Sequence, residues 1–230
     1  MSKKHILILN LLFETSLKTS FDKRIAEAFQ AIDTPHDTIY LNDIKEINRF
    51  DHYTHLMISG STESAAEENE WYPDLDAIIH SFISHGKSIL GICFGHQYIV
   101  RHILGKEHVR KSSTPEIGWT DITFSSNPIF RKINSLKSAV FHYDEVFDLD
   151  NQFEITASSA RCAVQGFQIK GKPIWGVQFH PDFMYQDVFK FAEDAREEND
   201  QFDRIHCQTV TSQDEFRVND QVFKNWIEIS

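Results

Sequence analysis

The sequence predicts an α/β fold whose central, mostly parallel sheet is flanked by helices and carries added antiparallel β ribbons. In the first 105 residues, segments that are apolar on both faces alternate with helical patterns, as in a parallel sheet covered on both sides. Residues 116–180 instead form short, β-rich segments separated by turn residues such as SSNP and LDNQ, which is typical of antiparallel strands. A chain of 230 residues is long enough to bury the core of such a fold.

The first half of the chain contains the expected parallel core. Strands are expected at four buried segments, His5–Leu11, Asp37–Leu41, His55–Ser59 and Ser88–Cys93. Helices are expected at three segments that lie between or after these strands, Asp22–Ile32, Asp74–His85 and Gly95–Leu104. In the second helix the apolar residues recur at the i, i+3, i+4 spacing of one buried face, at Leu75, Ile78, Ile79, Phe82 and Ile83.

The last part of the chain is expected to complete the sheet and then to turn helical. The segment KPIWGVQF is expected to return to the sheet. An amphipathic helix is expected over Tyr185–Glu198, with four residues facing inward, Val188, Phe189, Phe191 and Ala192. After the polar stretch EENDQFD, an apolar pattern predicts a closing helix or pair of helices, through Phe216, Val222, Phe223, Trp226 and Ile227. Because no linker rich in Pro, Gly or Ser divides the chain, we expect one domain over residues 1–200, with residues 201–230 as a helical extension packed on it.

The composition excludes several classes of function. The formal net charge is −11 at pH 7, the pI is about 5.5, and no cluster of Lys and Arg exceeds two residues, so nucleic acid is not an expected partner. No segment has the roughly 18–20 apolar residues that span a bilayer, and the apolar N-terminus is better explained as a buried strand than as a signal peptide. The three cysteines do not make a disulfide framework. We therefore expect a cytoplasmic protein that contacts no membrane.

Cys93 lies where an expected strand gives way to an expected helix, between Gly91 and Gly95. This G-x-C-x-G pattern is the thiol form of the nucleophile elbow, in which glycines relieve crowding at a sharp strand-to-helix turn. The N-terminus of the following helix favours negative charge on the sulfur. The N–H of Phe94 would face an oxyanion on an attacked carbonyl. A buried cysteine that only packs is the alternative, but the two glycines favour a nucleophile.

His180 is the histidine most suited to act as the base for this thiol. It ends an expected strand in the segment GVQFHPDF, where Pro181 cannot continue the strand and fixes the direction of the chain. Asp182, two residues further on, is placed to accept a hydrogen bond from the imidazole and to hold its tautomer. For His180 alone, a strand-end histidine bonded to the backbone is an equally good interpretation. Together with Cys93, the three residues offer a Cys–His–carboxylate arrangement.

These two segments and four others resemble the class I (triad) glutamine amidotransferase domain. GICFGHQ and WGVQFHPD are similar to the family motifs G-x-C-x-G-x-Q and G-x-Q-F-H-P-E. Four more segments are similar and follow in the family's order, LMISGSTESAAEEN, EIGWTDI, FHYDEVFDL and ITASSARCAVQGFQI. The resemblance covers roughly Ile6 to Phe191 and implies a flavodoxin-like fold. Within the family, the chain looks like a free-standing member, similar to γ-glutamyl peptidases and to the amidotransferase domain of GMP synthase.

The resemblance implies a mechanism and a set of site residues. Cys93 would attack the γ-carboxamide carbon of glutamine or a γ-glutamyl compound, and Asp182 would orient His180. His180 would activate the thiol, protonate the departing ammonia or amine, and then activate the water that hydrolyses the γ-glutamyl thioester. The family's oxyanion-hole positions match the backbone of Gly60, Ser61 and Phe94, and its substrate-contacting positions match Gln97, Tyr143 and Asp144.

The chain departs from the family pattern in three respects. The usual triad Glu is replaced by Asp182, which is one methylene shorter. The second glycine and the proline of the family's S-G-G-P-x-S loop are replaced by Ser61 and Thr62, so the loop is less clearly prepared to present an N–H. The chain also contains no ATP-pyrophosphatase motif of the type S-G-G-x-D-S, although amidotransferases of this class deliver ammonia to a synthetase or synthase.

Three functions therefore stay open. The protein is expected to act alone as a γ-glutamyl hydrolase, to supply ammonia to a separate synthetase or synthase chain, or to bind a ligand with little catalysis. The expected partner is a small molecule, glutamine or a γ-glutamyl peptide, and no cofactor is expected. No metal site is expected either, because the histidines near the elbow match no standard ligand spacing, namely His96, His102 and His108.

Overall fold

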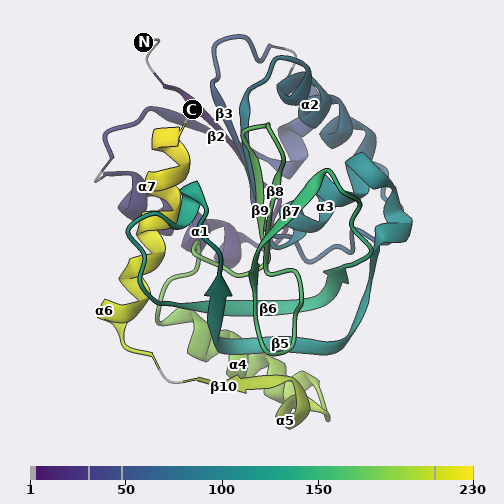
Figure 1. The fold of residues 1–230 in the computed structure, drawn as a ribbon. Coiled ribbons are helices and arrows are strands. Elements are labelled where there is room, and N and C mark those ends of the chain that lie inside the picture. The colour runs from purple at the N-terminus through teal and green to yellow at the C-terminus, as the bar shows by residue number, and fades with distance from the viewer. Residues whose placement is uncertain (1–3, 31, 48, 210, 230) are drawn as a thin grey trace.

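One mixed sheet organises the chain (Figure 1). The computed structural model describes residues 4–30, 32–47, 49–209 and 211–229. Within these ranges ten strands form the sheet, in the order β10-β5-β7-β8-β9-β4-β3-β1-β2, with β6 paired to β5. The strands are β1 (Ile6–Asn10), β2 (His36–Tyr40), β3 (His55–Ile58), β4 (Ser88–Ile92), β5 (Val109–Phe124), β6 (Leu136–Val146), β7 (Phe153–Ser158), β8 (Gly166–Ile169), β9 (Ile174–Val177) and β10 (His206–Gln208).

The sheet has a parallel part and an antiparallel part. Strands β2, β1, β3, β4 and β9 pair in parallel, so the expected return of the KPIWGVQF segment to the sheet is confirmed. Strands β5 to β8 form antiparallel ribbons, and β8 joins them to β9. Because β3, β4 and β9 are parallel neighbours, the residues that follow their carboxyl ends meet at one edge of the sheet.

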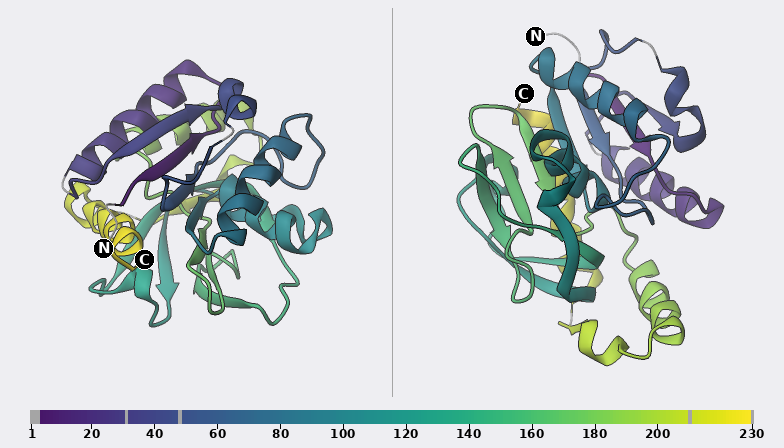
Figure 2. Two further views of the ribbon diagram at one scale, coloured as in Figure 1. Left: turned by 90° about the horizontal axis from the view of Figure 1, so that it is seen from above. Right: turned by 90° about the vertical axis from the view of Figure 1, so that its right-hand side faces the viewer.

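Helices cover both faces of the parallel strands (Figure 2). Leu7 and Leu9 of β1 pack into the cluster that contains residues of α2 and α3. Ile6 and Ile8, which point to the other face, pack into the cluster that contains residues of α1 and α7. This two-sided burial is why β1 is a continuous apolar run. The helices are α1 (Thr15–Gln30), α2 (Tyr72–Ser84), α3 (Phe94–Leu104), α4 (Asp187–Glu198), α5 (Phe202–Ile205), α6 (Gln213–Phe216) and α7 (Asp220–Ile229), with short 3-10 helices η1 (Leu41–Glu46), η2 (Lys106–His108), η3 (Pro128–Phe130) and η4 (Arg217–Asn219).

Two expectations about helices were wrong. Helix α1 begins at Thr15 instead of Asp22, because its first turns are polar and solvent-facing, and the apolar pattern starts only at Phe21. Phe189 of α4 was expected to face inward, but it is 53% exposed. The buried face of α4 is centred on Val188 and Ala195, so Phe189 lies about 100° away from it on the helix. No helix among the described residues combines the length and apolar character needed to cross a membrane.

The C-terminal helix α7 shares the core of the parallel sheet. Trp226 is fully buried, and its ring lies 5.1 Å from that of His55 at the start of β3. Phe223 packs against Phe29 of α1, with ring centroids 5.8 Å apart. We therefore propose that residues 201–230 unfold together with the rest of the chain as one domain.

Replacing Trp226 by alanine is expected to lower the free energy of unfolding by about 3–5 kcal/mol, because the change leaves a large cavity. Urea unfolding followed by circular dichroism measures this, and the transition should stay single. The matched control is Lys224→Ala on the exposed face of the same helix, which should change stability by less than about 0.5 kcal/mol. A separate early transition for the C-terminal helices in the native protein would contradict a single domain.

Candidate active site

Cys93 occupies a sharp turn between β4 and α3. Its backbone has φ 50° and ψ −103°, a strained conformation for a non-glycine residue that is found mainly at functional sites. The flanking glycines allow this turn. A Cβ on Gly91 would lie 2.4 Å from the carbonyl carbon of Gly95, and a Cβ on Gly95 would lie 2.5 Å from the carbonyl oxygen of Ile58. The first turn of α3 is therefore pressed against β4 and the end of β3, and side chains at these two positions would prevent it.

His180 and Asp182 follow β9 at the same edge of the sheet. The His180 N–H donates to the carbonyl oxygen of Ala139 at 2.7 Å, which fixes the backbone. Nδ1 of His180 lies 3.0 Å from Oδ1 of Asp182, and both residues are buried. Phe183 stacks on the imidazole with ring centroids 3.8 Å apart, and its carbonyl oxygen accepts from Nε of Arg24 at 3.2 Å. The ring of His180 is therefore held on its edge by Asp182 and on one face by Phe183.

The structure brings Cys93 and His180 together at the turn after β3. A Cβ placed on Gly60 would lie 3.2 Å from Cε1 of His180 and 3.7 Å from Cβ of Cys93. Both side chains therefore contact the same short segment, although they are 87 residues apart in the sequence. The Cys93 residue is 7% exposed, so the junction of these three segments is nearly closed.

The His180 imidazole has a raised pKa. Burial, the largest single influence, lowers it, but the negative charges of the Cys93 and Asp182 side chains and the Asp182 hydrogen bond outweigh burial and raise the pKa from 6.5 to about 10. Nε2 of His180 makes no hydrogen bond within the described structure, and the sulfur lies 3.7 Å from the carbonyl oxygen of Phe141. We infer that the sulfur acts on the ring chiefly through charge. The direction of this shift favours the protonated imidazole, the form that can act as an acid.

Two segments bring backbone amides close to the cysteine, the start of α3 and the turn after β3. Phe94 is the first residue of α3, so its N–H has no acceptor within the helix. Gly60 and Ser61 follow β3, and neither N–H donates to a protein acceptor in the part of the chain that the structure describes. These amides are the groups that the sequence predicted for an oxyanion hole, and the direction of each peptide bond decides which of them can serve.

The predicted substrate-contacting residues lie next to this junction. Nε2 of Gln97 donates to the carbonyl oxygen of Asp144 at 3.1 Å and to Oε1 of Gln178 at 3.0 Å. The Asp144 carboxylate is buried, with Oδ2 accepting from Ser64 at 2.6 Å and Oδ1 paired with Nζ of Lys111 at 2.9 Å. Tyr143 is 39% exposed. Gln97 and the 143–144 backbone are thus connected directly, as a shared binding role would require.

A buried polar network contacts the 143–144 backbone through His142. Nδ1 of His142 contacts the carbonyl oxygen of Asp144 at 3.0 Å, which can only accept, and Nε2 contacts Oε2 of Glu116 at 3.1 Å. Glu116 also accepts from Ser159 at 2.8 Å and from Gln165 at 2.6 Å. Because the Asp144 carbonyl can only accept, Nδ1 of His142 donates to it, and the contact between Nε2 and Glu116 holds the other side of the ring. Sequence analysis did not anticipate this network, since it joins four separated segments.

The same network places two cysteines where a metal site has to be considered. Ligand atoms of Glu116, His142 and Cys162 lie within 4.8 Å of one another, and Sγ of Cys207 lies 3.8 Å from Oε1 of Glu116. Burial raises the pKa of the Cys162 thiol to about 12 and that of Cys207 to about 11. Metal ligation needs thiolates and a free imidazole lone pair, whereas the raised pKa values keep these thiols neutral and both nitrogens of His142 already have hydrogen-bond partners. Hydrogen bonding therefore explains the arrangement, and the residues do not fit a metal.

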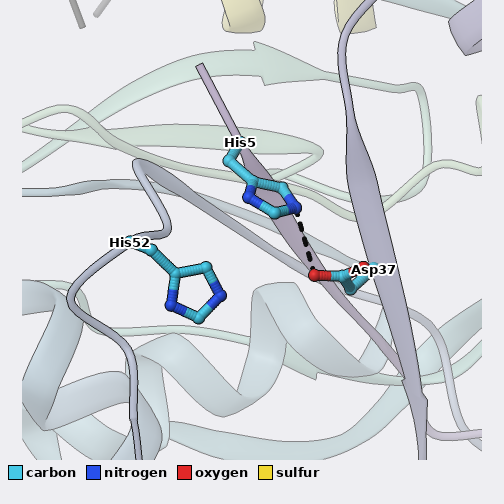
Figure 3. Close-up of side chains that lie close together, drawn as sticks. All are labelled: His5, Asp37 and His52. Atoms are coloured by element: carbon cyan, nitrogen blue, oxygen red, sulfur yellow. Dashed lines mark ion pairs between the residues drawn. The ribbon is translucent and has the colours of Figure 1, made fainter. Parts of the chain in front are cut away.

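A second cluster lies at the opposite, amino edge of the sheet (Figure 3). His5, Asp37 and His52 have ligand atoms within 4.8 Å of one another. Oδ2 of Asp37 already lies 3.1 Å from Nε2 of His5 and accepts from the Tyr53 hydroxyl at 2.8 Å. Hydrogen bonds account for this partly exposed group, and it is far along the strands from Cys93.

Two surface hollows lie away from Cys93. One, of about 710 Å³, is lined by residues of α2 and α3, including Asp76 and Arg101. The other, of about 400 Å³, lies beside α7 and is lined by residues that include Lys132 and Lys224. Neither contains the cysteine or the histidine, so the chemistry of the side chains, and not the size of a hollow, identifies the candidate site.

Comparisons with known proteins agree with this placement of the fold. The model of the family Glutamine amidotransferase class-I matches residues 16–188. A subunit of the glutamine-hydrolyzing GMP synthase of Thermoplasma acidophilum is 35% identical over 156 residues, which cover 65% of this chain and 74% of that protein. Gamma-glutamyl peptidase 2 of Arabidopsis thaliana is 32% identical over 136 residues, which cover 57% of this chain and 54% of that protein.

Solved structures show the same fold. A glutamine amidotransferase from Methylobacillus flagellatus superposes with a TM-score of 0.77 at 18% identity, covering 99% of this chain and 95% of that one. A glutamine amidotransferase from Thermotoga maritima superposes with a TM-score of 0.74 at 19% identity, covering 98% and 99%. These identities are low, so the likeness concerns the fold alone. The family match over residues 16–188 goes further, and the chain therefore belongs to the class I glutamine amidotransferase family.

Proposed function

We propose that this protein hydrolyses the γ-amide bond of glutamine or of a γ-glutamyl compound through a thioester at Cys93. The single observation behind the proposal is the convergence of a strained cysteine, a buried His180–Asp182 pair and the Gly60–Ser61 turn at one edge of the sheet. Membership of the amidotransferase family supports the same reaction class. A buried cysteine that only packed would need neither a charged imidazole beside it nor a strained backbone.

The reaction proceeds in two halves. The Cys93 sulfur attacks the γ-carbonyl carbon, and the backbone N–H groups of Phe94 and Ser61 stabilise the oxyanion. Protonated His180 gives its proton to the nitrogen, the C–N bond breaks, and ammonia or an amine leaves. Water then attacks the γ-glutamyl thioester while His180 takes a proton from it, the C–S bond breaks, and glutamate is released. Asp182 keeps the imidazole oriented in both halves.

A second candidate differs only in the fate of the nitrogen. One relative is named as a subunit of a glutamine-hydrolyzing GMP synthase, so we also propose, as an alternative, that this chain supplies ammonia from glutamine to a separate synthetase chain. The relative named as a peptidase favours the first candidate, in which the leaving group is an amine. The same thioester serves both.

The test is a substrate screen with matched isomers. The protein is incubated with glutamine and with γ-glutamyl dipeptides, each beside its α-glutamyl isomer, and glutamate release is measured. Acid-quenched samples are then digested, and mass spectrometry determines whether the Cys93 peptide has gained one glutamyl group. Glutamate from γ-linked substrates alone, with a modified Cys93 peptide, is the expected result.

Each other outcome selects a different function. Turnover of glutamine without turnover of dipeptides favours the ammonia-supplying role. Equal turnover of α- and γ-linked isomers overturns the proposal, because the site would then not distinguish a γ-glutamyl bond from an α-glutamyl bond. Tight binding of γ-glutamyl compounds without turnover or thioester identifies a binding protein on this fold.

A further inference from the structure

The oxyanion loop of this chain lacks the second glycine and the proline that the family uses, and Ser61 and Thr62 take their places. The contacts of the remaining loop residues therefore determine how the peptide bonds there are oriented. Ser59, the residue immediately after β3, is fully buried and makes hydrogen bonds in several directions. Its hydroxyl accepts from the N–H of Leu11 at 2.8 Å and donates to the carbonyl oxygen of Gly60 at 2.8 Å.

These hydrogen bonds fix the direction of the Gly60–Ser61 peptide. The Ser59 hydroxyl has one proton to donate. Its oxygen accepts the hydrogen bond from the Leu11 N–H, and its proton is donated to the Gly60 carbonyl oxygen. In a trans peptide the C=O and the N–H of the next residue point in opposite directions. The sheet order places β3 between β1 and β4. The Gly60 carbonyl turns toward the β1 side, where Leu11 lies, so the Ser61 N–H turns toward the β4 side, where Cys93 lies.

The preceding peptide is fixed in the reverse sense. The carbonyl oxygen of Ser59 accepts from the N–H of Gly95 in α3 at 3.2 Å, so this carbonyl points toward the cysteine side. The N–H of Gly60 then points away from it. Of the two amides that the sequence offered, Ser61 is therefore the one that can meet an oxyanion on a carbonyl attacked by Cys93.

We propose that Ser59 is a positioning residue that locks the Gly60–Ser61 peptide so that the Ser61 N–H completes the oxyanion hole. This inference rests on the proposed function of the same site. In this role Ser59 acts through the peptide, by the hydrogen bonds of its hydroxyl to Leu11 and Gly60. The lock orients this peptide without the second glycine and the proline that follow the serine in the family motif, and it makes the hole ready before substrate binds.

The test compares Ser59→Ala with Ser88→Ala. Ser88 is also buried at a strand of the parallel sheet, but its hydroxyl has no partner within the described structure, so the control removes the same atom without breaking a hydrogen bond. Ser59→Ala should lower kcat for a γ-glutamyl amide about 10–100-fold while leaving KM within about twofold, because the lost stabilisation belongs to the transition state. Ser88→Ala should change neither.

Two further measurements separate positioning from a general structural role. Alkylation of Cys93 by iodoacetamide displaces iodide from a saturated carbon and forms no oxyanion, so its rate should be the same in all three proteins. In ¹⁵N-labelled protein, the Ser61 amide should give one sharp resonance in the wild type and in Ser88→Ala, but a broadened or doubled one in Ser59→Ala. Parallel losses of kcat and alkylation rate would show a structural role and overturn the proposal, as would an unchanged kcat in Ser59→Ala.

Failure of the proposed function is distinguishable from failure of this inference. If the wild type hydrolyses no γ-glutamyl amide, the proposed function is wrong. The Ser61 amide resonance alone then tests whether Ser59 fixes the Gly60–Ser61 peptide. A Ser61 resonance that is unaltered by Ser59→Ala would then overturn this inference. A resonance that broadens in that variant and not in Ser88→Ala would support the orientation of the peptide independently of turnover.

Discussion

Replacing Cys93 by serine is expected to lower kcat/KM for γ-glutamyl hydrolysis by at least about 10⁴-fold. In the proposed mechanism the thiolate of Cys93 is the nucleophile, and negative charge on Cys93 is one of the causes that raise the pKa of His180. A serine hydroxyl remains neutral and must lose its proton during attack. The loss of the charge at position 93 also lowers the pKa of His180, but a neutral hydroxyl that must lose its proton during attack is a much weaker nucleophile than a thiolate, so the attack slows. Initial rates of glutamate release, measured at equal protein concentration, give the size of the effect.

The matched control for this change is Cys162→Ser. Cys162 is also a free, buried cysteine, but it lies in the network around Glu116 and not at the elbow. It should keep most of the activity and should still gain a glutamyl group on the Cys93 peptide. Thermal unfolding of both variants checks that the fold is intact. Wild-type turnover in folded Cys93→Ser would rule out the thioester mechanism.

Much of the parallel core could be predicted from the sequence because its evidence is local. Strands β1, β3 and β4 are buried on both faces, so each is a short continuous apolar run, and each expected segment matched the structure to within a residue at either end. The elbow is local as well. Gly91 and Gly95 lie two residues from Cys93, and the close approaches that require them occur within the turn or against the neighbouring strand.

Features that depend on contacts between distant segments could not be predicted in the same way. The hydrogen bond from Leu11 to Ser59 joins residues 48 positions apart, and the one between His142 and Glu116 spans 26. Nothing in either local pattern distinguishes these polar side chains from solvated ones. Strand β10 was missed for a similar reason, since three residues that pair with β5 carry no periodic pattern. In each case the sequence does not show which distant residue or strand forms the contact, because that depends on the tertiary structure.

Replacing Asp182 by asparagine is expected to lower kcat about 10²–10⁴-fold, because the residue that orients a catalytic histidine loses its charge. Asparagine keeps the shape of the side chain, but its amide nitrogen can face Nδ1 of His180 and hold the wrong tautomer. The change also removes a negative charge that raises the pKa of His180. The pKa of His180 must therefore fall. The imidazole then loses, at a lower pH, the proton that it must give to the leaving amine. A profile of kcat from pH 6 to 10 should show its alkaline limb displaced to lower pH.

Two comparison variants make this effect specific. Asp76→Asn changes another His–Asp pair, in which Nδ1 of His102 lies 2.7 Å from Oδ1 of Asp76 on the surface of α2 and α3, and it should leave kcat and the alkaline limb unchanged. Asp182→Glu restores the family's usual acid but adds a methylene to a site that is 3% exposed. Such overpacking typically costs about 1–3 kcal/mol, so its activity should lie between those of the wild type and Asp182→Asn. If Asp182→Asn retained the wild-type kcat and alkaline limb, the hydrogen bond between His180 and Asp182 would have only a structural role. Full activity in Asp182→Glu would instead mean that the site has room for the longer side chain. Its carboxylate would then hold the imidazole as well as that of Asp182 does.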